Sequence, residues 1–98
     1  MTKQLKTNYD IWREEKLKNP EFRKFYKEEA AKFSIAMKIK KLRESIGITQ
    51  QKLAKLTNTS QSAIARIENT DYEGYTLAKL IEIAEALGAK LVIDFIPI

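Results

Sequence analysis

Apolar positions in the middle of the chain recur at helical intervals. Ile35, Ile39, Leu42 and Ile46 follow one another at steps of four, three and four residues, which places them on one face of a helix. Gly47 comes directly after them and can supply the left-handed residue that ends many helices. The pattern therefore predicts a helix that packs one face on a core and ends at Gly47.

Two short helices are predicted next in the chain. Thr49 can cap a helix that runs to about Thr57, and Ser60 can cap one that runs to about Asn69, because each hydroxyl can accept a hydrogen bond from an early backbone amide.

A further helix is predicted to begin at Thr76 and to end at Gly88. Its apolar side chains, expected to face inward, are Leu77, Leu80, Ile81, Ala84 and Leu87.

The N-terminal region is predicted to form two helices, at about residues 8–18 and 20–32. Asn19 can cap the second one, and Pro20 has the backbone angle of a first helical position. Six of the nine aromatic residues of the chain lie before residue 34. We expect these helices to be an extension of residues 1–32 that precedes the main domain.

The pattern changes period in the tail, residues 89–98. Apolar Leu91, Ile93 and Phe95 alternate with Val92, Asp94 and Ile96, and Pro97 follows, which predicts one β-strand. A lone strand has no ladder partner within its chain, so we expect these six residues to pair with the same strand of a second copy in a homodimer. The alternative is an extended tail that packs on the helices.

The composition excludes most catalytic chemistry. The chain contains no cysteine and no histidine, so the usual thiolate and imidazole groups of hydrolytic and metal sites are absent. No convergent set of carboxylate, lysine or serine side chains takes their place. We expect no enzyme activity, no cofactor and no metal. We also expect a cytoplasmic protein without a membrane partner, since no apolar run reaches the roughly 20 residues of a membrane span and the N-terminus lacks a signal-peptide core.

The net charge of +5 is unevenly distributed. Residues 1–32 carry +3, residues 33–69 carry +5 and residues 70–98 carry −3. A basic peak is typical of proteins that bind nucleic acid, because lysine and arginine displace the counterions of the duplex. A solvated basic face is the alternative interpretation.

The basic segment contains the spacing of a helix-turn-helix. Ala54 is small, as a close crossing of two helices requires, and Asn58 tolerates a left-handed turn. Ile64 and Ile67 stand where the second helix would contact the core. The second helix is therefore predicted to read DNA.

Residue types on this helix fit contacts with base edges. Gln61 can pair with adenine, Arg66 with guanine, and the methyl group of Ala65 can meet that of thymine, with Ser62 beside them. The residues at the two helix N-termini are better placed for phosphate, namely Thr49, Gln50, Gln51, Thr59 and Ser60. Each of these polar residues also has a purely structural explanation as a cap or a surface residue.

Two segments, KKLRESIGITQQKLAKLTNTSQSAIARIEN and TLAKLIEIAEALG, resemble the Xre-type helix-turn-helix family of the Cro and lambda-like repressors. The resemblance implies a five-helix DNA-binding domain at residues 33–88 and a structural ion pair between Arg43 and Glu68. Two positions depart from the family pattern, since Asn58 and Thr70 stand where glycine is usual. The expected fold class is mainly α, with this lambda-repressor-like domain, an N-terminal helical extension and one C-terminal β-strand.

The flanking segments NPEFRKFYKEEAAKF and ALGAKLVIDFIP look like those of HigA-type antitoxins. This resemblance implies a dimer that represses its own operon on double-stranded operator DNA and also sequesters a RelE/HigB-like mRNA-cleaving toxin. The candidate toxin-binding residues are Tyr9, Trp12, Phe22, Phe25 and Tyr26, because aromatic side chains make effective interface anchors. Alternatively, the phenylalanines pack on the core. The chain could also be a stand-alone repressor, or an interaction module that has lost DNA binding.

Overall fold

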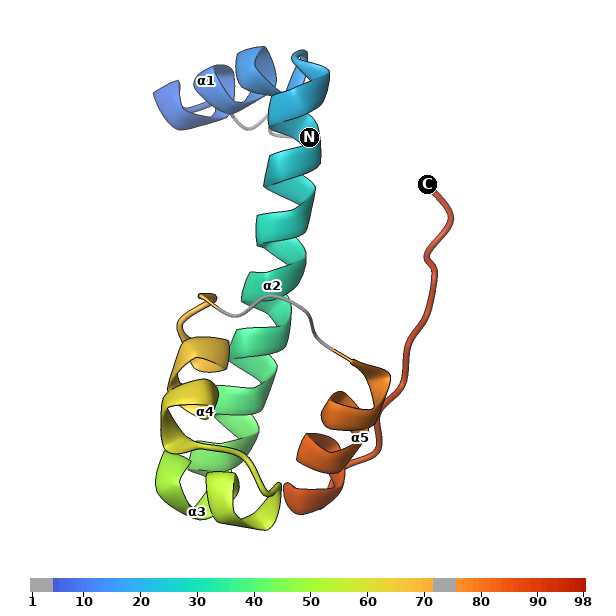
Figure 1. The fold of residues 1–98 in the computed structure, drawn as a ribbon. Helices are drawn as coiled ribbons and strands as arrows, with labels where there is room; N and C mark the ends of the chain where they lie inside the picture. The colour runs from blue at the N-terminus through green and yellow to red at the C-terminus, as the bar shows by residue number, and fades with distance from the viewer. Residues whose placement is uncertain (1–4, 72–75) are drawn as a thin grey trace. The chain divides into compact units, whose positions relative to one another are not determined.

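The computed structural model describes residues 5–71 and 76–98. Within them the chain forms five helices, shown in Figure 1: α1 (Asn8–Leu17), α2 (Pro20–Ser45), α3 (Gln50–Leu56), α4 (Gln61–Glu68) and α5 (Leu77–Ala86). The chain divides into two compact units, Met1–Lys32 and Phe33–Ile98.

The predicted caps are confirmed. The hydroxyl oxygens of Thr49, Ser60 and Thr76 each accept a hydrogen bond of 3.0–3.1 Å from the backbone amide three residues later. Asn19 Oδ1 accepts hydrogen bonds from the first amides of α2. Helix α1 begins with a reciprocal cap that was not predicted. The backbone amide of Thr7 donates to the Asp10 carboxylate and lowers the pKa of that group.

Residues 20–32 and the helix that follows them were predicted as separate elements, and this is wrong. Helix α2 is continuous over 26 residues. Residues 27–38, KEEAAKFSIAMK, contain no glycine or proline and mostly strong helix formers, so no residue interrupts the backbone hydrogen bonding.

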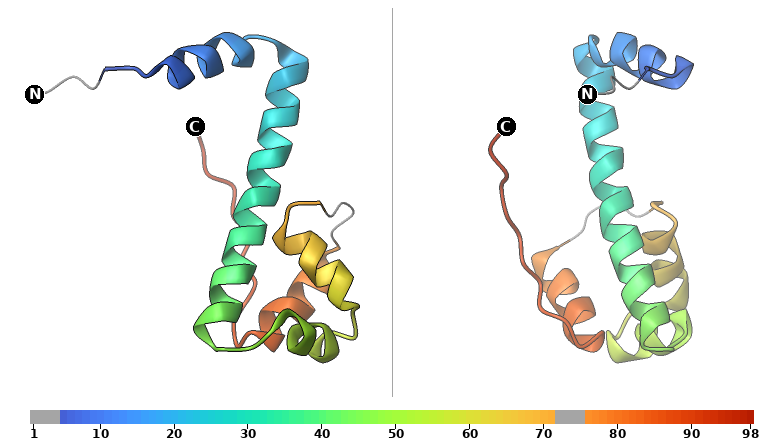
Figure 2. Two further views of the ribbon diagram at one scale, coloured as in Figure 1. Left: turned by 90° about the vertical axis from the view of Figure 1, so that its left-hand side faces the viewer. Right: turned by 180° about the vertical axis from the view of Figure 1, so that it is seen from behind.

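The predicted C-terminal strand is also wrong. The structure has no strand anywhere in residues 5–71 and 76–98, and residues 89–98 are extended and irregular after α5 (Figure 2). The physical reason is that a single segment of alternating residues has no ladder partner in its own chain. The tail does not pack closely on the helices either, because Ala89 and Leu91 are its only partly buried residues and the others are exposed.

The core of the second unit is aliphatic. It consists of Ile39, Leu53, Ala54, Ile64, Ile67, Ile83 and Leu87, and Ile35, Ile48 and Ala86 pack against it. Four residues that were expected to face inward are exposed, namely Leu42, Ile46, Leu77 and Ile81. In α5 the buried side is centred near Ile83, and successive helical residues are rotated by about 100°, so Leu77 and Ile81 fall outside it. The apolar pattern did not distinguish the two sides of this helix.

Backbone conformation explains the turn residues. Gly47 and Asn58 have left-handed φ values of 76° and 49°, as predicted, and Gly88, which was predicted to end the last helix, has one of 70°. Thr70, which departs from the family pattern, has a φ of 62°. A β-branched residue is strained in this region because its side chain crowds the backbone.

Replacing Thr70 with glycine is therefore expected to stabilise the domain by about 0.5–1 kcal/mol, the relief of strain being partly offset by the greater freedom of glycine in the unfolded chain. Urea denaturation of the two proteins measures the difference. Asn69→Gly is the control, because Asn69 is exposed at the end of α4 with a φ of −100°, where glycine should be destabilising. Equal losses at both positions would show that Thr70 is not strained.

Candidate nucleic-acid interface

Helices α3 and α4 and the turn between them form one compact motif. Ala54 of α3 is buried among the core residues, where its methyl side chain allows α3 to contact α4 closely. The backbone amide of Thr59 donates a 2.9 Å hydrogen bond to the Ala54 carbonyl, which closes the turn around left-handed Asn58. This geometry agrees with the predicted spacing of a helix-turn-helix.

Helix α4 has one buried and one exposed side. Ile64 and Ile67 are buried in the core, whereas Gln61, Ser62 and Arg66 are exposed and Ala65 is partly exposed. The four residues predicted to read bases therefore lie away from the buried isoleucines. Their contacts with DNA remain predictions.

Among the predicted phosphate-binding residues, Thr49, Gln51 and Ser60 are exposed at or next to the N-termini of α3 and α4. The hydroxyls of Thr49 and Ser60 accept the capping hydrogen bonds, and a hydroxyl that accepts can still donate its own proton to an anion. These positions combine a donor with the positive end of a helix dipole, which favours an anion.

Gln50 and Thr59 are engaged inside the domain. The Gln50 side-chain amide donates a hydrogen bond of 3.2 Å to Glu68, and the Thr59 hydroxyl donates its single proton to the Thr57 carbonyl. Thr59 also accepts a hydrogen bond from Lys79. The contacts of Gln50 with Glu68 and of Thr59 with Lys79 could not be predicted from the sequence, because the partners lie 18 and 20 residues apart in the chain.

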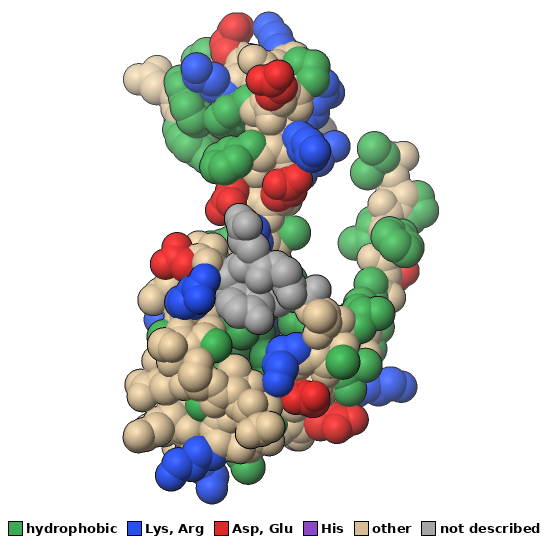
Figure 3. Space-filling view, viewed as in Figure 1, with side chains coloured by type: hydrophobic (Ala, Val, Ile, Leu, Met, Phe, Trp, Pro, Cys, Tyr) green, Lys and Arg blue, Asp and Glu red, His purple; other side chains and the backbone are tan. Residues whose placement is uncertain are grey.

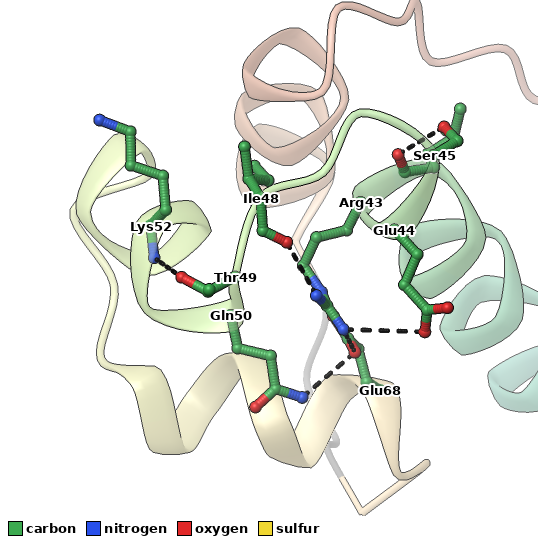
Figure 4. Close-up of polar contacts among 9 residues, drawn as sticks. Arg43, Glu44, Ser45, Ile48, Thr49, Gln50, Lys52 and Glu68 are labelled. Atoms are coloured by element: carbon green, nitrogen blue, oxygen red, sulfur yellow. Dashed lines mark hydrogen bonds and ion pairs between the residues drawn. The ribbon is translucent and has the colours of Figure 1, made fainter.

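Arg43 and Glu68 form a two-pronged ion pair, as the resemblance implied. The guanidinium Nε and Nη2 donate to the two carboxylate oxygens at 2.7 and 2.9 Å, and Nη1 donates to the Ile48 carbonyl at 2.9 Å. The side chains are 12% and 1% exposed. Figure 4 shows Arg43, Gln50 and Glu68 converging on one point, so α2, the following loop, α3 and α4 are linked there.

The charges of this pair are mutually stabilised. Burial alone would raise the pKa of Glu68, but the hydrogen bonds from Arg43 and Gln50 outweigh it and lower that pKa below its ordinary value. The hydrogen bond to Glu68 raises the pKa of Arg43. Glu68 is therefore ionised in the folded domain at neutral pH.

Basic side chains that the residue predictions left out lie on α3. Lys52 and Lys55 are exposed on the helix that precedes the turn. Both lysines belong to the basic segment of residues 33–69, but no feature of the sequence marked them individually. Their charge adds to the attraction of this face for an anionic partner.

The aromatic surface of the N-terminal unit consists of Tyr9, Trp12, Phe22, Phe25 and Tyr26. Trp12 packs edge-on against Phe22, with ring centroids 5.9 Å apart, and Phe22 stacks on Tyr26 at 6.5 Å. Tyr9, Trp12 and Phe25 are nevertheless 59%, 48% and 58% exposed. Figure 3 shows hydrophobic side chains gathered over this unit. Among the described residues, the core of the second unit contains no aromatic side chain.

Comparison with known proteins identifies one family. The model of the helix-turn-helix family matches residues 39–93, more than half of the chain. No curated protein matches the chain. In the part of the chain that the structure describes, no helix is long and apolar enough to cross a membrane, and no group of acidic residues could hold a metal ion.

Proposed function

The chain belongs to the Xre-type helix-turn-helix family, and from this premise we propose that it is an antitoxin that represses its own operon and neutralises an mRNA-cleaving toxin. Family membership makes it a DNA-binding transcription regulator. The toxin, the operon and the dimer belong to the proposal.

DNA binding is supported by the two sides of α4. Its exposed side is polar, and its opposite side is apolar and buried in the core. In the proposed complex α4 enters the major groove, where Gln61 and Arg66 contact base edges. The N-termini of α3 and α4 contact phosphate through Thr49, Ser60 and their backbone amides.

Replacing Arg66 with alanine is expected to lower discrimination at one base pair by about 1–3 kcal/mol, because a bidentate contact with guanine is lost. The test first selects a DNA duplex from a random pool with the unsubstituted chain. Fluorescence anisotropy then measures binding of both proteins to this duplex and to its single-base variants. Arg66→Lys is the matched control, since it keeps the charge but not the forked geometry. If binding weakens equally on every sequence, Arg66 contacts phosphate instead of a base.

We propose that the operator is bound by a homodimer that associates through the apolar tail. Val92, Phe95 and Ile96 are largely exposed in the single chain, and burying such side chains is favourable. A dimer would bind half-sites about one helical turn apart. Analytical ultracentrifugation of the full chain and of Val92→Asp/Phe95→Asp tests the proposal, which a monomeric unsubstituted chain would refute.

The antitoxin part rests on the flanking resemblance and on the aromatic surface. An exposed cluster that contains tryptophan and tyrosine is typical of the centre of protein interfaces. A toxin that cleaves RNA is expected to be basic, and the acidic pairs Glu14/Glu15 and Glu28/Glu29 lie in the same unit. These pairs can attract it locally, although residues 1–32 carry a net charge of +3.

The test uses the full chain with Tyr9, Trp12 and Phe25 each replaced by serine. We expect this variant to lose at least about thirtyfold in affinity for the product of the neighbouring gene, because interface anchors of this kind typically contribute 2 kcal/mol or more. It should also fail to restore in vitro translation in the presence of that product. Circular dichroism verifies that the helices persist, and binding to operator DNA should be unchanged.

Leu42→Ser/Ile46→Ser is a matched control for lost exposed apolar area, because both residues are exposed outside the aromatic surface. Equal loss of capture in both variants would argue against the aromatic surface as the specific site. If the unsubstituted chain captures nothing and the neighbouring product is harmless, the chain is a stand-alone Xre-type repressor.

A further inference from the structure

A lysine of α5 contacts the turn between α3 and α4. Lys79 Nζ donates hydrogen bonds to the Thr57 carbonyl at 3.1 Å and to the Thr59 hydroxyl at 3.0 Å. A third contact, at 3.0 Å, joins it to Glu82 one turn further along α5. An ammonium group has three protons, so these three contacts account for all of its donors. Its side chain is only 28% exposed.

The two turn residues that receive these hydrogen bonds lie on either side of Asn58. Thr57 ends α3, so its carbonyl lies at the negative end of that helix and has no helical partner. Thr59 directly precedes Ser60, the cap of α4. The Thr59 hydroxyl donates to the Thr57 carbonyl at 2.9 Å, so a closed triangle of hydrogen bonds joins the two residues and Lys79.

The position of Lys79 is unfavourable for α5 itself. It is the third residue of that helix, where the positive end of the dipole repels a cation. Glu82 offsets part of this repulsion, but glutamate is also the residue type that would suit the position of Lys79 better. A cation at this point is therefore explained by what it contacts outside α5.

We propose that Lys79 is a positioning residue for DNA recognition, which fixes the turn and thereby orients the N-terminus of α4 before DNA arrives. The proposal rests on the DNA-binding function. Fixing the turn in advance lowers the conformational cost of binding, because Ser60, Gln61 and Ser62 do not have to be ordered on the duplex. Lys79 itself has no proton left for a phosphate while its three contacts hold.

The experiment compares the full chain with Lys79→Met, which keeps an unbranched side chain of nearly the same length and removes its donors. The DNA is a duplex selected from a random pool by the unsubstituted chain. We expect affinity to fall about tenfold, the scale of ordering one or two side chains, with the slope of log K against log salt unchanged. Lys38→Met, exposed on α2, controls for the loss of one positive charge.

Two further variants separate this role from a general loss of fold. Thr59→Val removes the other side-chain member of the triangle, so it should weaken binding by a similar factor, and the double variant should be no weaker than either single one. Lys79→Arg keeps a donor and should recover part of the affinity. Amide hydrogen exchange should accelerate at residues 58–61 in Lys79→Met while Leu53 and Ile64 stay protected.

Several results would overturn the proposal. Unchanged affinity in Lys79→Met would remove its basis, as would strictly additive losses in the double variant. A salt slope smaller by about one would instead identify Lys79 as a phosphate contact. If the unsubstituted chain binds no duplex, the DNA-binding function itself fails, and hydrogen exchange alone then decides whether Lys79 fixes the turn.

Discussion

Replacing Arg43 with methionine is expected to lower the free energy of unfolding of the helix-turn-helix domain by about 3–5 kcal/mol, because the variant leaves the Glu68 carboxylate buried without its cation. The Ile48 carbonyl loses a donor in the same change. A domain of this size has a total stability of only about 5–15 kcal/mol, so the variant should lose a large share of it and unfold at a markedly lower urea concentration. Urea denaturation followed by circular dichroism measures the loss.

The pH dependence gives a second measure of the same pair. The pKa of Glu68 is lowered in the folded state, so its contribution to stability is complete above the ordinary glutamate value of about 4.3 and is lost as the pH falls through the lower folded value. In Arg43→Met, burial without the cation should raise that pKa. Acidification should therefore narrow the difference in stability between the two proteins.

Lys41→Met, an exposed position on the same helix, is the control for Arg43→Met, and its stability should change by less than about 0.5 kcal/mol. A loss below about 1 kcal/mol in Arg43→Met would show that the pair contributes no more than a surface ion pair.

Replacing Ile64 with alanine is expected to destabilise the domain by about 2–5 kcal/mol, since removing a buried isoleucine side chain leaves a cavity. Ile64 is fully buried and belongs to α4, the helix proposed to read DNA. Denaturant unfolding measures the loss of stability, and anisotropy at low temperature, where the variant is still folded, measures DNA binding.

The matched control for Ile64→Ala is Ile81→Ala, because Ile81 is exposed on α5 and its truncation should change stability by less than about 1 kcal/mol. If Ile64→Ala were as mild as its control, α4 would not be held by the core as the structure shows.

Local features of this fold could be predicted from the sequence. Each of these features depends only on residues a few positions from it in the chain. Four of them are confirmed, namely the caps at Thr49, Ser60 and Thr76 and the left-handed turn at Asn58. The buried isoleucines of α4 also followed from their spacing. Such features are encoded by short-range sterics and hydrogen bonding.

Features that depend on distant residues could not be predicted. The contacts of Lys79 with Thr57 and Thr59 join residues about 20 positions apart, and no periodicity marks them. The strand in the tail, residues 89–98, was predicted from alternation alone, but a strand also requires a neighbour, which alternation does not supply. The predicted break within α2 failed because a change in the apolar pattern does not interrupt helical hydrogen bonds.

The convergence on Glu68 has a consequence for selectivity between DNA sequences. Its carboxylate ties the start of α3, through Gln50, to the end of α4, and Arg43 holds both to α2. The start of α3, which is suited to contact phosphate, is thus held in a fixed position relative to α4, which is suited to contact bases. A substitution that loosens this joint would leave both faces chemically intact, yet each could then settle on the duplex separately. Such a protein would still adhere to DNA while distinguishing its operator poorly from any other sequence.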